Sequence, residues 1–286
     1  PTAAPPTPLT EFVTIRDPGN TTDTTGFGDV SYVYQIGKYA IRETDIDDYN
    51  ADPANAGTLQ ITLDERGDDK PATDIAWNEC ARYVNWLNTR EGEQGAYKFT
   101  TNGVNDPITL WSSAEAWQTG GENRYRHKDA KYFLPSENEW YKAAFYKSGG
   151  TNAGYWLYPT GSDSAPVGTL GSTTAGEAVY NDGIVSPTEP ADVDQAGGLS
   201  PYGTMGQGGN TFEWNESAFD GTNDTTTELR VLRGCSWFNN SSLLLSSDRS
   251  PASPDFDGFN GGFRVAKVYD RFTSEFGMNL TDNTGI

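Results

Sequence analysis

Side chains that commonly carry enzyme chemistry are scarce in this sequence. His127 is its one histidine, and Cys80 and Cys235 are its two cysteines. Iron, copper and zinc sites in proteins are built largely from imidazole and thiolate ligands. A single histidine therefore excludes a histidine-rich site for these metals within one chain. His127 lies in a basic stretch, residues 124–128, and we expect it to be an exposed loop residue.

The segment from residue 237 to residue 260 interleaves aromatic side chains with amides and carboxylates. Aromatic rings stack on ligand faces, and amides and carboxylates pair with hydroxyl and amide groups. This combination suits a polar ligand such as a glycan or a peptide of a protein partner. The alternative is that Asn and Asp serve turn geometry while Phe anchors the loop. The candidate ligand-binding residues are Trp237, Phe238, Asn239, Asn240, Asp248, Arg249, Asp255, Phe256, Asp257, Phe259 and Asn260.

The charge of the chain limits its partners. The 286 residues carry a formal net charge of −20, with a pI near 4.3. Such a charge repels nucleic acid phosphates, so we expect no nucleic acid partner. No apolar run approaches the roughly 18 residues that a membrane span needs, so we expect none. The chain opens with a Pro- and Thr-rich stretch without an initiator Met, which favours an exported protein located extracellularly or at the cell surface.

Two helices are predicted to position these segments. Apolar residues recur at helical spacing from Trp77 to Leu87, which predicts an amphipathic helix with Cys80 on its buried face. Ser136 and Glu139 form a capping-box pair that begins a second helix.

Short strands and long loops account for the rest of the chain. Residues 12–15 and 31–41 are strand candidates, and residues 229–233 and 263–268 alternate polar and apolar side chains and could pair with each other. Residues 147–227 are rich in Gly, Ser, Thr, Asn and Pro, which predicts loops. We therefore expect one α+β domain over residues 10–268, between a Pro/Thr-rich tail at 1–9 and a polar tail at 269–286.

Four segments, taken in order, resemble the sulfatase-modifying factor family, whose founding member is the formylglycine-generating enzyme. They are residues 77–87, residues 133–144, residues 202–214 and the pair 231–237 with 262–266. The resemblance implies a formylglycine-generating-enzyme-like fold, related to C-type lectins. Such a fold has small twisted antiparallel sheets, two short helices and long loops. Because one fold can serve many functions, the site has to be judged residue by residue.

The resemblance places the two catalytic cysteines of the family at Asn239 and Leu244. Neither side chain can ligate copper(I), which prefers sulfur, and the iron-dependent relatives require three histidines. We therefore expect no copper, iron or zinc, and a non-catalytic protein that binds a ligand or assembles with copies of itself through its tails. The alternative is a metal-dependent or unconventional oxidoreductase that uses residues such as Ser236, Asp248 and Arg249.

The same resemblance implies a calcium site, because relatives bind calcium through hard oxygens around a Gly-Asn-x-x-Glu segment. In this chain the segment supplies Gly209, Thr211 and Glu213, while Gly206 stands where an acidic or amide ligand usually precedes them. Asn181 and Asp182 are candidates for a second site. The alternative is that Glu213 hydrogen-bonds to the loop backbone.

Two states of the cysteines are open at this point. The structural disulfide of the family falls on Val84 and Val265 in this chain. Cys80 precedes Val84 by one turn, and Cys235 lies on the strand expected to pair with that of Val265. A Cys80–Cys235 disulfide is one interpretation and two buried free thiols are the other, while a redox or metal-binding role of the thiols is a further alternative.

Overall fold

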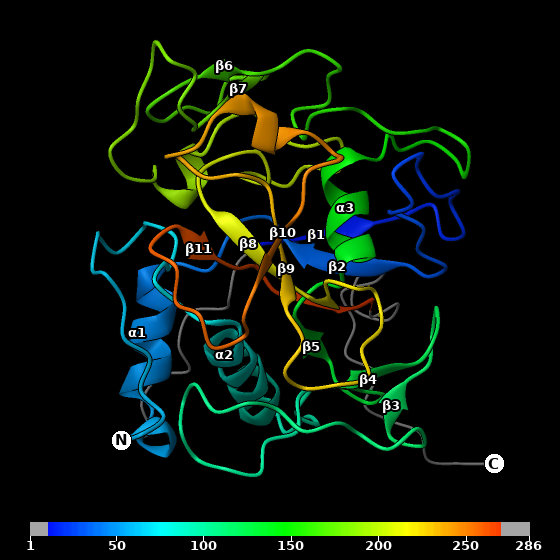
Figure 1. The fold of residues 1–286 in the computed structure, drawn as a ribbon, viewed down its shortest axis with the longest axis vertical. Helices are drawn as coiled ribbons and strands as arrows, with labels where there is room; N and C mark the ends of the chain where they lie inside the picture. The colour runs from blue at the N-terminus through cyan, green and yellow to red at the C-terminus, as the bar shows by residue number, and fades with distance from the viewer. Residues whose placement is uncertain (1–10, 270–286) are drawn as a thin grey trace, which may run out of the picture.

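The computed structural model describes residues 11–269, so the predicted tail at 1–9 and all but the first residue of the tail at 269–286 lie outside it. Three α-helices and twelve short strands occur in the described part (Figure 1). The helices are α1 (Glu43–Ala51), α2 (Trp77–Arg90) and α3 (Glu137–Phe145). The strands are β1 (Phe12–Ile15), β2 (Tyr34–Gly37), β3 (Ala116–Trp117), β4 (Asn123–His127), β5 (Tyr132–Phe133), β6 (Val167–Gly168), β7 (Glu177–Ala178), β8 (Phe212–Ala218), β9 (Arg230–Arg233), β10 (Ser250–Ala252), β11 (Gly261–Gly262) and β12 (Ala266–Val268).

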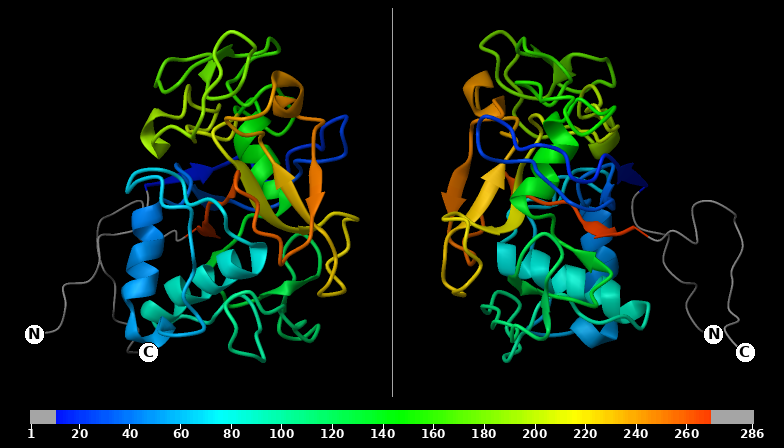
Figure 2. Two further views of the ribbon diagram at one scale, coloured as in Figure 1. Left: turned by 60° about the vertical axis from the view of Figure 1, so that its left-hand side comes forward. Right: turned by 90° about the vertical axis from the view of Figure 1, so that its right-hand side faces the viewer.

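Two four-stranded sheets form the centre of the molecule. One has the order β1-β2-β12-β5, and the other has the order β10-β9-β8-β11, with β11 parallel to β8. Two further pairs, β3 with β4 and β6 with β7, lie in the surrounding loops. In Figures 1 and 2 the loops around β6 and β7 gather at one end of the molecule, while α1 and α2 lie towards the other.

The predicted pairing of residues 229–233 with 263–268 is wrong. β9 pairs with β8 and β10, whereas β12 pairs with β2 and β5. The chain changes sheets between β11 and β12, and Arg264 lies in this crossing with its guanidinium fully buried. An alternating pattern identifies a strand, but it does not identify the neighbour of that strand.

Both predicted helices are confirmed. α2 buries Trp77, Cys80, Val84 and Leu87 as their spacing requires. At the start of α3 the Ser136 hydroxyl accepts a hydrogen bond from the backbone N–H of Glu139, and the Glu139 carboxylate accepts one from the N–H of Ser136.

The third helix, α1, was not predicted. Its sequence is mostly polar, and Ile46 and Tyr49 are the two apolar side chains that it buries. Its start is held by Arg42 and Asp45, since the Asp45 carboxylate accepts from the Arg42 backbone N–H at 2.9 Å. A pair of apolar residues is too weak a pattern to predict a helix.

The two cysteines are buried free thiols, which was one of the two interpretations, and they do not form the disulfide of the other. Cys80 and Cys235 are both free and buried, and they pack in different hydrophobic clusters. Cys80 lies in the main core beneath α2, whereas Cys235 packs with Tyr180 and Leu244. Burial raises the pKa of the Cys235 thiol to about 12 and holds that of Cys80 well above its ordinary value, so neither thiol is activated as a nucleophile.

The expectation of an exposed loop residue at His127 is also wrong. His127 ends β4 and is 8% exposed, with its ring 4.5 Å from the ring of Trp111. Burial lowers the pKa of the imidazole, which favours the neutral ring seen accepting a bond from the Asp129 N–H. His127 is therefore a packing residue.

No helix within residues 11–269 combines the length and the apolar character that crossing a bilayer requires.

Candidate ligand-binding site

A sharp turn after β9 sets the direction in which the chain enters the predicted ligand-binding segment. Gly234 and Cys235 both adopt positive φ angles, +98° and +69°. A Cβ atom on Gly234 would lie 2.8 Å from the carbonyl oxygen of Gln207, so only glycine is accommodated there. After this turn the Trp237 N–H donates to the Asn210 carbonyl at 3.0 Å. The turn thereby places Ser236 and Trp237 inward and Phe238 outward.

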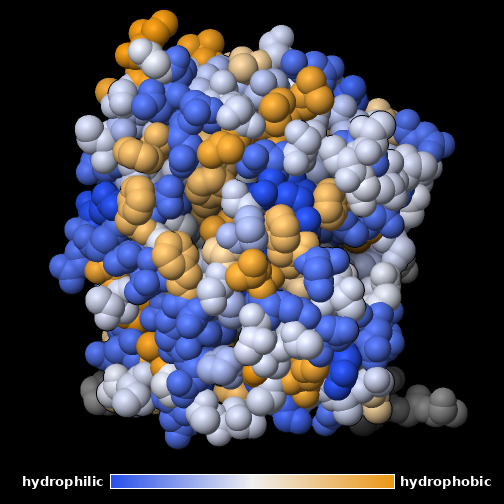
Figure 3. All heavy atoms as spheres, viewed as in Figure 1, coloured by the Kyte–Doolittle hydropathy of each residue, from blue (hydrophilic) through white to orange (hydrophobic). Residues whose placement is uncertain are grey.

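Three aromatic rings form a cluster after this turn, with Phe259 in contact with both Trp237 and Phe238. Trp237 is 2% exposed, and the Arg66 guanidinium carbon lies 4.9 Å from its ring centre. The ring of Phe259 meets Trp237 edge-on at 5.9 Å and Phe238 edge-on at 5.7 Å. Phe238 and Phe259 are 60% and 50% exposed, although large apolar side chains are normally covered. Figure 3 shows hydrophobic side chains gathered near the middle of the face that carries β8 to β11, between hydrophilic ones.

A small network of amides lies beside these rings. The Ser236 hydroxyl donates to Asn239 Oδ1 at 2.6 Å, and Asn260 Nδ2 donates to Ser236 Oγ at 3.0 Å and to Asn239 Oδ1 at 3.3 Å. Asn239 Nδ2 and Asn260 Oδ1 have no hydrogen-bond partner among residues 11–269. The network thus fixes two partly exposed amides and leaves one donor and one acceptor open. We call Trp237, Phe238, Asn239, Phe259 and Asn260 the aromatic–amide surface.

Carboxylates border this surface. Burial raises the pKa of Asp74, and the negative charges of Asp257 and Asp64 raise it further. Asp255 is held locally, since it accepts from the Ser253 hydroxyl and its carbonyl accepts from Asn105. These groups make the border acidic, which opposes anionic ligands.

Several predicted site residues lie outside the aromatic–amide surface. Arg249 forms an ion pair with Glu137 at 2.7 Å, and Arg233 contacts the same carboxylate at 2.6 Å. Asp248 is partly buried, which raises its pKa, and its backbone carbonyl accepts from Arg233. The Asn240 side chain accepts from the Ser242 N–H at the start of a 3-10 turn, Ser241–Leu244. Turn geometry and structural ion pairs therefore explain these three candidates.

Phe256 is 53% exposed but has no ring contact among the described residues. Arg66 was not predicted as a site residue, although its guanidinium lies over the ring of Trp237. It precedes Trp237 by more than 170 residues in the sequence, and no local pattern connects the two.

The candidate calcium ligands have other partners. The two Glu213 oxygens accept from Arg264 at 2.6 Å each, and one of them also accepts from Trp140 Nε1 at 2.6 Å. The Thr211 hydroxyl donates to the Asn260 carbonyl, and Gly209 donates its N–H to Gly234.

Asn181 and Asp182 form their own turn. Asn181 Oδ1 accepts from the Gly183 N–H, and the Asp182 carboxylate accepts from three backbone N–H groups. Across residues 11–269, no three His, Cys, Asp or Glu side chains are placed to hold one metal ion. Calcium binding stays a prediction, and a calcium ion at Glu213 would have to compete with Arg264 for the same oxygens.

A model of the sulfatase-modifying factor enzyme 1-like domain matches residues 22–269. This chain belongs to the sulfatase-modifying factor family. The membership confirms the predicted α+β fold, with three helices in the described residues in place of the expected two.

Solved structures of other proteins are similar in fold to this family member. Treponema denticola variable protein 1 is 18% identical, with a TM-score of 0.60 over 90% of this chain and 95% of that one. CarF is 19% identical, with a TM-score of 0.60 over 91% and 99%. PvdO from Pseudomonas aeruginosa is 17% identical, with a TM-score of 0.53 over 91% and 92%. At these identities the similarity concerns the fold alone. No match was found among curated proteins.

The two positions at which the family resemblance places catalytic cysteines have different surroundings in this member. Asn239 belongs to the amide network of the aromatic–amide surface. Leu244 is 1% exposed and packs against Cys235 and Tyr180. One position is therefore polar and accessible, while the other is part of the core.

Proposed function

We propose that this member of the sulfatase-modifying factor family is a non-catalytic recognition domain, located extracellularly or at the cell surface. It binds a polar ligand on the aromatic–amide surface. The observation that carries the proposal is the pair of exposed rings, Phe238 and Phe259, beside an open amide donor and an open amide acceptor. Exposed aromatic rings cost solvation free energy unless a partner covers them.

The chemistry of this surface favours a neutral glycan. A sugar ring presents C–H groups on one face, which stack on aromatic rings, and hydroxyl groups at its edge, which pair with amides. Asn239 Nδ2 offers the donor and Asn260 Oδ1 the acceptor that adjacent hydroxyls require. The carboxylates of Asp255 and Asp257 at the border oppose sulfated or phosphorylated ligands.

The positions of the alternative catalytic residues support a role without catalysis. Ser236 is engaged by Asn239 and Asn260, whereas Arg249 is engaged by Glu137. A nucleophile needs a base within hydrogen-bond reach, and the Ser236 hydroxyl pairs with the amides of Asn239 and Asn260, which do not act as bases.

A panel of neutral and sulfated oligosaccharides, measured by saturation-transfer NMR, tests the proposal. Phe238→Ala and Phe259→Ala should each weaken binding of the best neutral glycan about ten-fold, since each removes a stacking ring. Phe256→Ala is the matched control, because it removes an equally exposed ring from the same segment without touching the pair.

The binding of the three variants decides whether the aromatic–amide surface is the site. Loss of binding in the two ring variants, with the control unchanged, supports the aromatic–amide surface as the site. Equal losses in all three variants, or preference for sulfated glycans, would refute it.

A further inference from the structure

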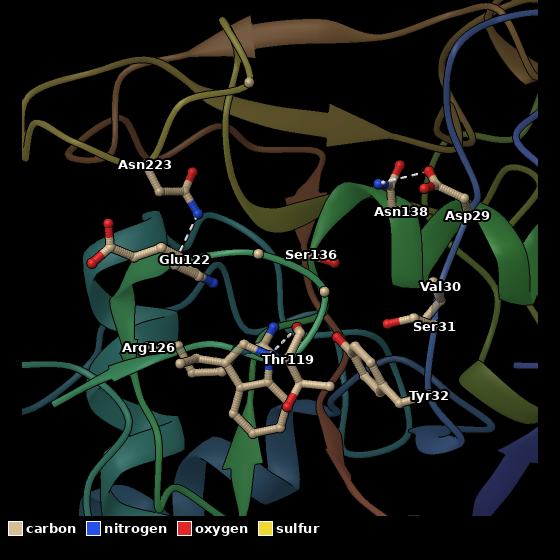
Figure 4. A pocket seen from close by; sticks show the side chains of 15 residues that line it. Asp29, Val30, Ser31, Tyr32, Thr119, Glu122, Arg126, Ser136, Asn138 and Asn223 are labelled. Carbon is tan, nitrogen blue, oxygen red and sulfur yellow. Dashed lines mark hydrogen bonds between the residues drawn. The ribbon is translucent and has the colours of Figure 1, made fainter. Parts of the chain in front are cut away.

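A separate cavity of about 410 Å³ lies away from the aromatic–amide surface, and none of the five residues of that surface lines it (Figure 4). Its walls come from four segments that are distant in sequence. These are residues 29–32, the loop 117–123 with Arg126 of β4, the start of α3 and the loop that joins β8 to β9. A cavity of this volume lies in the range typical of small-molecule sites.

Arg126 lines the base of the cavity and belongs to a buried ionic cluster, whose two acids, Glu139 and Glu216, do not line the cavity. Arg126 is 1% exposed and lies between Glu139 at 2.9 Å and Glu216 at 2.7 Å, both fully buried. Tyr32 donates its hydroxyl hydrogen to Glu139 at 2.6 Å, and Asn123 donates to Glu216. Burial raises the pKa of Glu216, which favours its neutral form and so reduces the negative charge of the cluster.

The rim of the cavity adds negative charge and no positive charge. Asp29 and Glu122 line it, and Arg126 is the one basic residue among the lining residues. Figure 4 shows Glu122 and Asn223 on one side of the opening, with Asp29 and Asn138 on the other. The field inside the cavity therefore attracts cations and repels anions.

Two aromatic rings complete the wall. Tyr32 and Trp117 meet edge-on with ring centres 5.7 Å apart, and both line the cavity. The loop beside them turns at Gly120 and Gly121, which have φ angles of +83° and +121°. A Cβ atom on Gly121 would meet no atom within 4 Å, so this loop leaves open space at the rim.

We propose that this cavity binds a small organic ammonium ion, such as a quaternary or primary amine. The ammonium group pairs with the carboxylates of Asp29 and Glu122, the acidic side chains that line the cavity. The ring of Tyr32 attracts the same group through its negative face, as does the ring of Trp117, whose centre also lies 5.1 Å from the guanidinium carbon of Arg126. A metal ion would have to lose part of its hydration shell to contact these rings, whereas an organic cation uses both the charge and the apolar walls.

Calorimetric titration of the full chain with choline, compared with its uncharged isostere 3,3-dimethylbutan-1-ol, tests the proposal. The two probes have the same shape, so the difference reports the charge. Choline should bind about ten-fold or more tightly than the isostere, as expected for a cation desolvated against aromatic rings.

Two variants locate the binding. Glu122→Gln should weaken choline binding about three- to five-fold, because it removes one rim charge. Glu93→Gln is the matched control, since it removes an exposed carboxylate that does not line the cavity. Trp117→Leu should weaken choline about ten-fold while the melting temperature verifies folding. Equal affinity for the two probes, no binding of either, or equal effects of the two Gln variants would overturn the proposal.

Discussion

Glu79, near the start of α2, gives a prediction whose size can be worked out from the structure. Its side chain is nearly covered, at 8% exposed, and its carboxylate accepts from the Ala76 N–H at 2.8 Å. Burial raises the pKa of Glu79 to about 7, and the charges of Asp257 and Asp74 contribute, while the Ala76 hydrogen bond opposes the rise. Asp257 belongs to the segment that carries the aromatic–amide surface, so the titration of Glu79 reports on that border.

Proton linkage gives the direction in which the titration of Glu79 changes the free energy of unfolding. The folded protein holds the Glu79 proton up to a pH of about 7, whereas the unfolded chain releases it at a pH of about 4.5. Between these values the folded state binds more protons, so the free energy of unfolding falls as the pH rises. At about 1.4 kcal/mol for each pKa unit, Glu79 contributes a loss of roughly 3 kcal/mol over this window.

Glu79→Gln removes this loss, because the amide stays neutral and its oxygen can still accept from Ala76. At pH 8 the variant should be more stable than the wild type by up to roughly 3 kcal/mol, or about 6 °C in melting temperature for a chain of this size. Below pH 4.5 the two should melt alike. Urea unfolding and thermal melts from pH 4 to pH 8 measure the difference.

Two further variants make the test specific. Glu122→Gln removes the same charge from an exposed side chain and should leave the pH profile unchanged. Asp257→Asn should move the Glu79 transition to lower pH, because one neighbouring negative charge is gone. Parallel profiles for wild type and Glu79→Gln between pH 4.5 and pH 7 would refute the reasoning.

Four further measurements test other features of this protein. If calcium binds as the family resemblance implies, chelator should lower the melting temperature by several degrees, whereas an unchanged melting temperature would refute calcium binding and leave Arg264 as the partner of Glu213. Arg264→Leu should destabilise the fold by about 3 to 5 kcal/mol in urea unfolding, because it leaves the buried Glu213 charge unpaired. The control Lys38→Leu breaks an exposed ion pair with Glu11 and should cost less than about 1 kcal/mol. The intact mass should not change with reductant, and Cys80 and Cys235 should react with alkylating reagent only after unfolding, whereas a gain of two mass units on reduction would indicate a disulfide. Light scattering of the full chain against residues 11–269 decides between ligand binding by a monomer and self-assembly through the tails, because loss of oligomers on truncation would favour assembly.

The local patterns that succeeded share one property, which is that neighbouring residues carry the whole signal. The spacing of Trp77, Cys80 and Leu87 sufficed for α2, and the capping pair of Ser136 and Glu139 sufficed for α3. The mostly polar α1 was missed because its stability comes from packing of Ile46 and Tyr49 against the rest of the fold. Strand pairing failed for a related reason, since alternation identifies a buried face but carries no information about the adjacent strand.

The sequence by itself determined the family, the fold class and the identities of the side chains at the thiol positions, because these depend on residue type and order. It also predicted the segment that contains the aromatic–amide surface. Only the tertiary structure decided which members of that segment meet, placing Phe238 and Phe259 beside the amides while ion pairs hold Arg249 elsewhere. It also decided that Glu213 faces Arg264 and that Arg66 covers Trp237. These contacts join residues far apart in the chain, and such contacts depend on the packing of the whole core, which no local pattern records.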